Sequence, residues 1–162
     1  MQNKFRYKAW ANEELLELIS QINKEEHPEQ WTMAVRLLNH THVVDRIFIA
    51  HLQRESHSYT ATNTQETPTI AELNASIRGT DHWLINFASE FDRSQDNRII
   101  NFMFTDSDRG SMSVREILDH LIIHGVYHRG NVGMLLTACG INRPGDTFTR
   151  FLHLNEPERR SR

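Results

Sequence analysis

Residues 119–130 read DHLIIHGVYHRG and lie in an apolar stretch with the period of an amphipathic helix. His124 and His128 stand four positions apart, so on a helix their imidazoles project from one face, about one turn from each other. Imidazoles placed among apolar side chains need polar partners, and a divalent metal ion satisfies several at once. The spacing therefore predicts a metal site on this helix.

A third histidine leaves the choice of ligands open. His120 stands four positions before His124, so these two fit the spacing as well as His124 and His128 do. Eight residues of helix span about 12 Å, which is too far for His120 and His128 to share one ion. Glu116 stands four positions before His120, so these two side chains can form a structural pair and His120 need not bind a metal.

The same helix contains glycines at positions 125, 130 and 133. Glycine inside a helix costs about 1 kcal/mol relative to alanine, so these positions indicate the close approach of a neighbouring helix or a ligand.

Four segments of the chain have a helical apolar period, and polar or turn-forming stretches separate them. We expect helices over residues 8–23, 29–53, 69–91 and 113–140. Two of these helices begin with a capping box, in which Thr69 is followed by Glu72 and Ser113 by Glu116. The pattern favours a helical bundle.

A small β-hairpin is expected before the last helix. Residues 98–104 alternate and are rich in Ile and Phe, and residues 105–110 have the composition of a turn. Residues 56–67 are rich in Ser, Thr and Asn and are typical of a surface loop. The predicted fold class is all-α, a four-helix bundle with a minor hairpin.

Length and charge exclude several classes of protein. The 162 residues are expected to form a single domain, 1–162, with frayed ends at 1–7 and 155–162. With 18 basic and 21 acidic residues, the net charge of −3 gives no basic stripe for nucleic acid. Cys139 is the single cysteine, and no 18 apolar residues run together. We therefore expect a soluble cytoplasmic protein that does not bind membranes.

The second predicted helix has an apolar stripe that includes two histidines, and its members are Met33, Leu37, His40, Val44, Ile47 and His51. His40 and His51 are about 16 Å apart along the helix, so one metal ion takes only one of them. His42 is predicted to lie on the opposite, exposed face. Four other histidines stand in polar settings and are also expected to be exposed: His27, His57, His82 and His153.

The residues beside these histidines have candidate supporting roles. Asp45 and Asp119 are candidates to accept hydrogen bonds from the ring nitrogens of the ligands. Tyr127 and Asn131 flank the predicted site in sequence. Arg129 turns about 100° away from His128 on the helix and is expected to pair with a carboxylate. The sequence does not identify a general base.

Four stretches of the chain carry a resemblance to a known family: YKAWANEELL at 7–16, LLNHTHVVDRIF at 37–48, DHLIIHGVYHRG at 119–130 and GINRPGD at 140–146. The chain resembles the DinB/YfiT-like family of small metal-binding helical bundles. The resemblance implies that His40, His124 and His128 bind zinc or nickel, with His120 a neighbour. It also implies homodimers and, for part of the wider family, low-molecular-weight thiols such as bacillithiol or mycothiol beside the metal.

Three histidine ligands leave one coordination position open, as in catalytic rather than structural zinc sites. Cys139 stands eleven residues after His128 and is too distant to fill that position. The leading hypothesis is a metalloenzyme acting on a small-molecule substrate, in particular a thiol-dependent S-transferase. The alternatives are a metal-dependent hydrolase and a non-enzymatic, stress-associated module in which the metal braces two helices.

Overall fold

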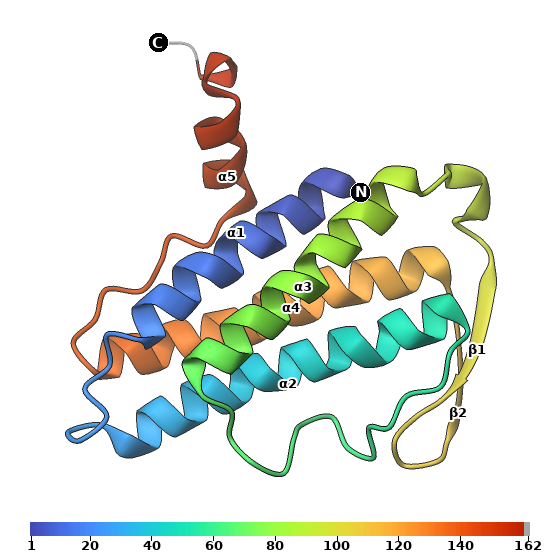
Figure 1. The fold of residues 1–162 in the computed structure, drawn as a ribbon. Helices are drawn as coiled ribbons and strands as arrows, with labels where there is room; N and C mark the ends of the chain where they lie inside the picture. Colours follow the sequence, from blue (N-terminus) through green and yellow to red (C-terminus); the bar gives the residue numbers. More distant parts are fainter. Residues whose placement is uncertain (161–162) are drawn as a thin grey trace.

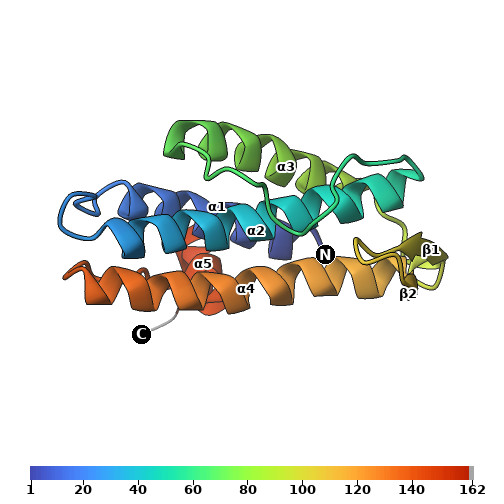
Figure 2. The same ribbon diagram turned by 90° about the horizontal axis from the view of Figure 1, so that it is seen from below.

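The computed structural model of the protein describes residues 1–160, except for the side chain of Arg93, and confirms an all-α bundle with a small hairpin (Figure 1). The elements are α1 (Gln2–Ile19), α2 (Pro28–Gln53), α3 (Ile70–Glu90), β1 (Ile99–Met103), β2 (Arg109–Ser113), α4 (Val114–Ala138) and α5 (Phe148–Asn155). Helix α2 packs mainly against α4, and α1 packs mainly against α3 (Figures 1 and 2). No helix within the described residues has the length and apolarity needed to cross a membrane.

Both predicted capping boxes are present. The Thr69 hydroxyl accepts a hydrogen bond from the Glu72 backbone N–H at 3.2 Å, and the Glu72 carboxylate accepts one from the Thr69 backbone N–H at 2.9 Å. Ser113 and Glu116 make the same reciprocal pair at 3.2 and 2.7 Å. These bonds satisfy amides that the helix itself leaves unpaired, and they fix where α3 and α4 begin.

The hairpin places aromatic side chains against the end of the bundle. Strands β1 and β2 are antiparallel, with Phe102 opposite Gly110 and Ile100 opposite Met112. Ile100 is buried among apolar residues of the bundle, which docks the hairpin on the helices. The ring of Phe102 packs edge-on against Phe48 of α2, with centroids 5.4 Å apart. The hairpin therefore forms a wall beside α2 and α4.

A layer of buried charges separates two apolar clusters of the core. Leu84 and Leu121 belong to one cluster, and Leu38 and Leu136 belong to the other. The ionic layer lies between them along all four long helices and consists of Lys8, Asn12, Asp45, Asp81 and Arg129. Nothing in the sequence pattern indicated this layer, because each helix contributes only one or two of its members.

Lys8 is the centre of the ionic layer, and only 2% of its side chain is exposed. Its Nζ donates to Asp45 at 2.6 Å and to Asp81 at 2.8 Å, and Asn12 donates to the other Asp81 oxygen at 2.8 Å. Burial lowers the pKa of Lys8, but the two carboxylates outweigh burial and raise it overall. Lys8 therefore remains charged inside the bundle.

The two ends of the chain correct the sequence-based expectation. Residues 1–7 were expected to be frayed, yet α1 begins at Gln2, and both Phe5 and Tyr7 are buried. The two side chains point about 200° apart on the helix, so Phe5 packs in the apolar core of the bundle while Tyr7 packs against α5. Helix α1 therefore begins earlier than the apolar period suggested. Near the other end, α5 was not predicted; its Phe151 packs against Tyr7 and Trp10 of α1. A single exposed turn, Pro157–Arg159, follows, and residues 161–162 lie outside the described residues.

Candidate metal centre

Three histidines from two helices meet between α2 and α4. His40 comes from α2, and His124 and His128 come from successive turns of α4. One ring nitrogen from each lies within 4.8 Å of the others, and the Nε2 atoms of His40 and His124 are 3.0 Å apart. Side-by-side packing of α2 and α4 brings these rings together although 84 positions separate His40 from His124 (Figure 2).

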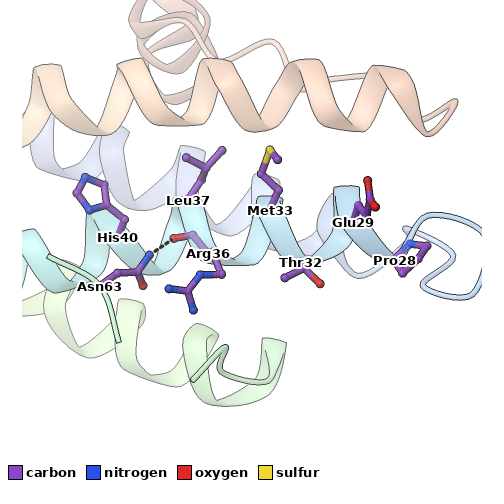
Figure 3. A pocket seen from close by; sticks show the side chains of 8 residues that line it. All are labelled: Pro28, Glu29, Thr32, Met33, Arg36, Leu37, His40 and Asn63. Carbon is purple, nitrogen blue, oxygen red and sulfur yellow. Dashed lines mark hydrogen bonds between the residues drawn. The ribbon is translucent and has the colours of Figure 1, made fainter. Parts of the chain in front are cut away.

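A loop carbonyl fixes the orientation of His40. The Nδ1–H of His40 donates to the Thr62 carbonyl at 2.7 Å, which leaves Nε2 as the lone-pair nitrogen facing His124. The loop is tied to α2 because Asn63 donates to the Arg36 carbonyl at 3.0 Å (Figure 3) and Asn39 donates to Asn63 at 2.6 Å. The segment 56–67 is thus a surface loop, as predicted, but it also orients a site residue, which its composition did not indicate.

Packing orients the other two rings. The His120 ring stacks on His124 with centroids 5.3 Å apart, and the Tyr127 ring meets His128 edge-on at 5.0 Å. The Nδ1 atoms of His124 and His128 are buried and have no hydrogen-bond partner among residues 1–160. Metal-ligating histidines usually donate through their second nitrogen. These two rings lack that hydrogen bond and are oriented by packing against neighbouring rings.

The electrostatics favour neutral rings, the form that binds metal ions. Burial, together with the neighbouring rings of His128 and His40, lowers the pKa of His124 to about 3. Burial also lowers the pKa of His128, with a further contribution from His40. At neutral pH, His124 and His128 therefore present lone pairs rather than positive charges.

The donor set fits a divalent transition metal ion. Each zinc–nitrogen bond is about 2.0–2.1 Å, so two nitrogens bound to one tetrahedral ion lie about 3.3 Å apart. The 3.0 Å between His40 and His124 is close to that spacing. Within the described part of the chain, the cluster of potential ligands contains these three histidines and no fourth residue. The arrangement can hold an ion with one position left for a small molecule.

The remaining histidines lie elsewhere. His120 is outside the ligand group, and Glu116, expected to pair with it, is engaged in the capping box at Ser113. His51 packs against Phe102 with nearly parallel rings 5.0 Å apart. His42, expected to be exposed, is buried, and its Nδ1 lies 3.3 Å from the Thr80 hydroxyl.

Burial, together with the Lys8 and Arg46 charges, lowers the pKa of His42 to about 4. The reason for the wrong prediction is that α2 is covered on two faces, by α4 on one and by α1 and α3 on the other. Of the four histidines expected to be exposed, His82 is exposed, whereas His27, His57 and His153 are half-buried.

Two carboxylates do not support the site as expected. Asp45 pairs with Lys8 in the ionic layer, and Asp119 accepts from Arg115 at 2.7 Å and from Lys4 at 3.1 Å. Arg129 does pair with a carboxylate, because its Nε donates to Asp146 at 2.7 Å. This bond, together with one from the Tyr7 hydroxyl to Asp146, ties the segment before α5 to the bundle.

The glycines of α4 were expected to mark close packing, and this holds at positions 125 and 133 but not at position 130. A Cβ at position 125 would lie 3.0 Å from the Arg129 guanidinium, so Gly125 makes room for the ionic layer rather than for a ligand. At position 133 a Cβ would meet Arg143 at 3.4 Å, and at position 130 it would meet nothing within 4 Å.

Two hollows reach the histidines from different sides. An open groove of about 690 Å³ runs along the first half of α2, with Met33, Leu37 and His40 on the side that faces α4 (Figure 3). Met33 was expected to point into the core but is 54% exposed, because it borders this groove. A second hollow, of about 340 Å³, lies under the hairpin and reaches both His40 and His124.

Comparison with known proteins identifies the family. Residues 1–160 match the model of the DinB family. Protein DinB of Bacillus subtilis (strain 168) is 21% identical over 165 residues, which cover 96% of this chain and 95% of that protein. No solved structure matches. Because the family model covers nearly the whole sequence, the chain belongs to the DinB family.

Proposed function

We propose that His40, His124 and His128 bind one divalent transition metal ion, zinc or nickel, and that the protein is a cytoplasmic metalloenzyme acting on a small molecule. One observation carries the proposal: three imidazole nitrogens from α2 and α4 come within 4.8 Å of one another. The membership of the chain in the DinB family is compatible with it.

Several features support an open site rather than a closed structural one. Structural zinc sites normally have four protein ligands and often include cysteine. Here Cys139 caps the end of α4, eleven residues beyond His128, and the potential ligands among residues 1–160 number three. The loop carbonyl of Thr62 holds the His40 ring without approaching as a ligand, since it accepts from Nδ1.

The leading candidate activity is a thiol-dependent S-transferase. A divalent ion with an open position lowers the pKa of a bound thiol or water and so supplies a nucleophile at neutral pH. In a transfer reaction the sulfur forms a bond to an electrophilic carbon, the leaving group departs with its electron pair, and the thiol proton passes to solvent. The two separate hollows that reach His40 favour a reaction of two substrates over hydrolysis of one.

Cobalt substitution tests this function. We expect the cobalt protein to gain a sulfur-to-metal charge-transfer band with one of bacillithiol, mycothiol, glutathione or a simple thiol. His128→Ala should abolish the band, whereas Cys139→Ser should leave it intact. If no thiol perturbs the spectrum but an ester or amide is turned over only with metal, the hydrolase alternative replaces the transferase. If neither occurs in metal-loaded protein, the ion only braces α2 and α4.

We also propose a homodimer formed through α4. Ile123 and Tyr127, four positions apart on one face of this helix, are 68% and 67% exposed, and Met134 on the same face is 59% exposed. Large apolar side chains gathered on one helix face are typical of a protein interface. Light scattering at micromolar concentration should give the mass of two chains, and Tyr127→Glu should give the mass of one. A monomeric parent protein would contradict the proposal.

A further inference from the structure

The hollow under the hairpin is a partly open chamber that reaches the histidine cluster. Its walls come from α2, the hairpin and α4, and its volume is about 340 Å³. Val44 and Phe48 line it from α2, Phe102 and Met112 line it from the hairpin, and His40 and His124 are also among its lining residues. We call this hollow the hairpin chamber.

The lining of the hairpin chamber excludes charged occupants. Apart from the histidines, its polar residues are Thr62 and Thr105, and no Asp, Glu, Lys or Arg of the described chain lines it. In the metal-free protein, an ionised group moved from water into such a space would lose its hydration without gaining a countercharge. Apolar surface, in contrast, gains free energy when it leaves water. The chamber therefore selects an uncharged, apolar group.

The size and the aromatic walls define that group further. A cavity of about 150 Å³ is enough to bind benzene, so about 340 Å³ holds a substituted aromatic ring. The rings of Phe48 and Phe102 meet edge to face at 5.4 Å, and those of Phe102 and Phe104 do so at 5.0 Å. An aromatic occupant can continue this edge-to-face packing, which is a favourable geometry for ring pairs.

Gly110 determines the shape of the outer wall. It stands opposite Phe102 in the hairpin, and a Cβ at this position would lie 2.7 Å from Cζ of Phe102 and 2.8 Å from the Phe104 ring. Both rings can therefore fold across the glycine. Any larger residue at position 110 would displace them and reshape the chamber without touching the histidines.

We propose that the hairpin chamber binds the uncharged, aromatic part of the substrate and directs its reacting atom toward His40 and His124. This inference rests on the proposed metal site for its catalytic meaning, but binding to the chamber does not need the ion. The aromatic part would occupy the chamber, while the thiol would approach along the open groove beside Met33 and Leu37.

Fluorine NMR titration of zinc-loaded and metal-free protein tests the proposal with three probes of one shape. The probes are 4-fluorobenzyl alcohol, which is neutral, and 4-fluorobenzoate and 4-fluorobenzylammonium, which are charged. In the metal-free protein we expect the neutral probe to bind about tenfold more tightly than either ion, because only ions lose hydration without compensation. In the zinc-loaded protein the neutral probe is compared with the ammonium probe, because a carboxylate can bind zinc. Amide shifts should cluster on α2, the hairpin and α4 around the chamber.

Variants of the hairpin distinguish binding inside the chamber from binding on the exposed surface of the hairpin. Met112→Trp should fill the chamber and weaken the neutral probe about tenfold, as expected for overlap with the occupant. Ile99→Trp adds the same ring to an exposed position of the same hairpin and should change nothing. Gly110→Ala, the milder variant, should change the affinity severalfold while the melting curve stays cooperative.

The outcomes for the chamber and for the metal site are distinguishable. Equal binding of all three probes to the metal-free protein, no binding, or an unchanged affinity in both Met112→Trp and Gly110→Ala would overturn the chamber proposal. The metal content of the same samples reports on the proposed function separately. Protein that binds the neutral probe but no metal would support the chamber and contradict the metal site.

Discussion

The ionic layer and the histidine cluster both place polar side chains between packed helices, but they treat those side chains differently. In the ionic layer, Lys8 bonds both Asp45 and Asp81, and Arg129 bonds Asp146. In the histidine cluster, two Nδ1 atoms are buried without a partner in the described chain, and the Nε2 atoms of His40 and His124 face each other.

This difference distinguishes polar groups that hold the fold from polar groups that await a ligand. Buried polar atoms are almost always hydrogen-bonded, since leaving one unpaired costs about 1–3 kcal/mol. The ionic layer satisfies this rule within the protein, with one Asp45 oxygen as its exception. In the histidine cluster the Nδ1 atoms of His124 and His128 break this rule, whereas the Nε2 atoms of His40 and His124 lie 3.0 Å apart, close enough to share one metal ion. We therefore propose that the first region stabilises the fold and that the facing nitrogens of the second bind an ion.

The largest effect is expected from Lys8→Met. This change leaves two carboxylates buried without their cation, and breaking a buried ion pair in this way costs about 3–5 kcal/mol. Urea unfolding of the metal-free protein measures the loss. Lys4→Met is the matched control on α1, because the side chains of Lys4 and Asp119 are 42% and 32% exposed and their pair should contribute less than about 1 kcal/mol. Equal losses in the two variants would remove the distinction between the regions.

Metal binding should stabilise the protein by a smaller amount. The proposed ligands come from two helices, and His40 and His124 are 84 positions apart, so the unfolded chain cannot present them together. Free zinc at 100 times its dissociation constant adds about 2.7 kcal/mol. For a domain of this size, that corresponds to a rise of roughly 5 to 10 °C in the melting temperature. A thermal scan of apoprotein with and without zinc measures it, and identical curves after verified loading would count against a site that bridges α2 and α4.

Alkaline pH should weaken the fold through Tyr7 and Lys8. Burial and the hydrogen bond to Asp146 raise the pKa of Tyr7 from 10.0 to about 12, although the Arg129 charge opposes this. A raised pKa means that the folded protein keeps the proton longer, so the stabilisation is complete below pH 10 and is lost as the pH rises toward 12. Lys8 acts in the same direction, since its pKa is also raised.

Unfolding in urea at several pH values between 8 and 11.5 follows this loss. Tyr7→Phe should show a shallower decline than the parent protein, because the variant has no phenol to titrate. A decline as steep in Tyr7→Phe as in the parent would show that the Tyr7 proton is not linked to folding.

The smallest effect is expected from His124→Leu in the metal-free protein. The change removes a buried nitrogen that has no partner and supplies apolar surface, so the free energy of unfolding should change by less than about 1 kcal/mol. The same variant should lose the stabilisation by zinc. If His124→Leu costs as much as Lys8→Met, the cluster belongs to the structural scaffold and the comparison between the regions fails.

Local signals in the sequence were sufficient for the helices and for part of the site. Thr69 with Glu72 and Ser113 with Glu116 fix two helix starts through bonds made within four residues. The spacing of His124 and His128 likewise depends only on the helix. These features were predicted because the interacting residues are neighbours in the chain.

Features made by distant residues were missed. Lys8, Asp45 and Asp81 come from three helices, and no local pattern links a lysine to carboxylates 37 and 73 positions away. Thr62 looked like one more polar loop residue, yet its carbonyl orients His40. The same reason applies to α5, an eight-residue helix whose packing depends on Tyr7 and Trp10 at the other end of the sequence.

Metal stoichiometry tests the central claim most directly. Protein prepared without an affinity tag, stripped with chelator, reloaded with zinc and freed of excess should contain about one ion per chain by elemental analysis. His40→Ala, His124→Ala and His128→Ala should each retain almost none, whereas His120→Ala should retain the full amount because its ring lies outside the ligand group. Parent protein with less than about half an equivalent, or a requirement for His120 in place of His128, would contradict the account.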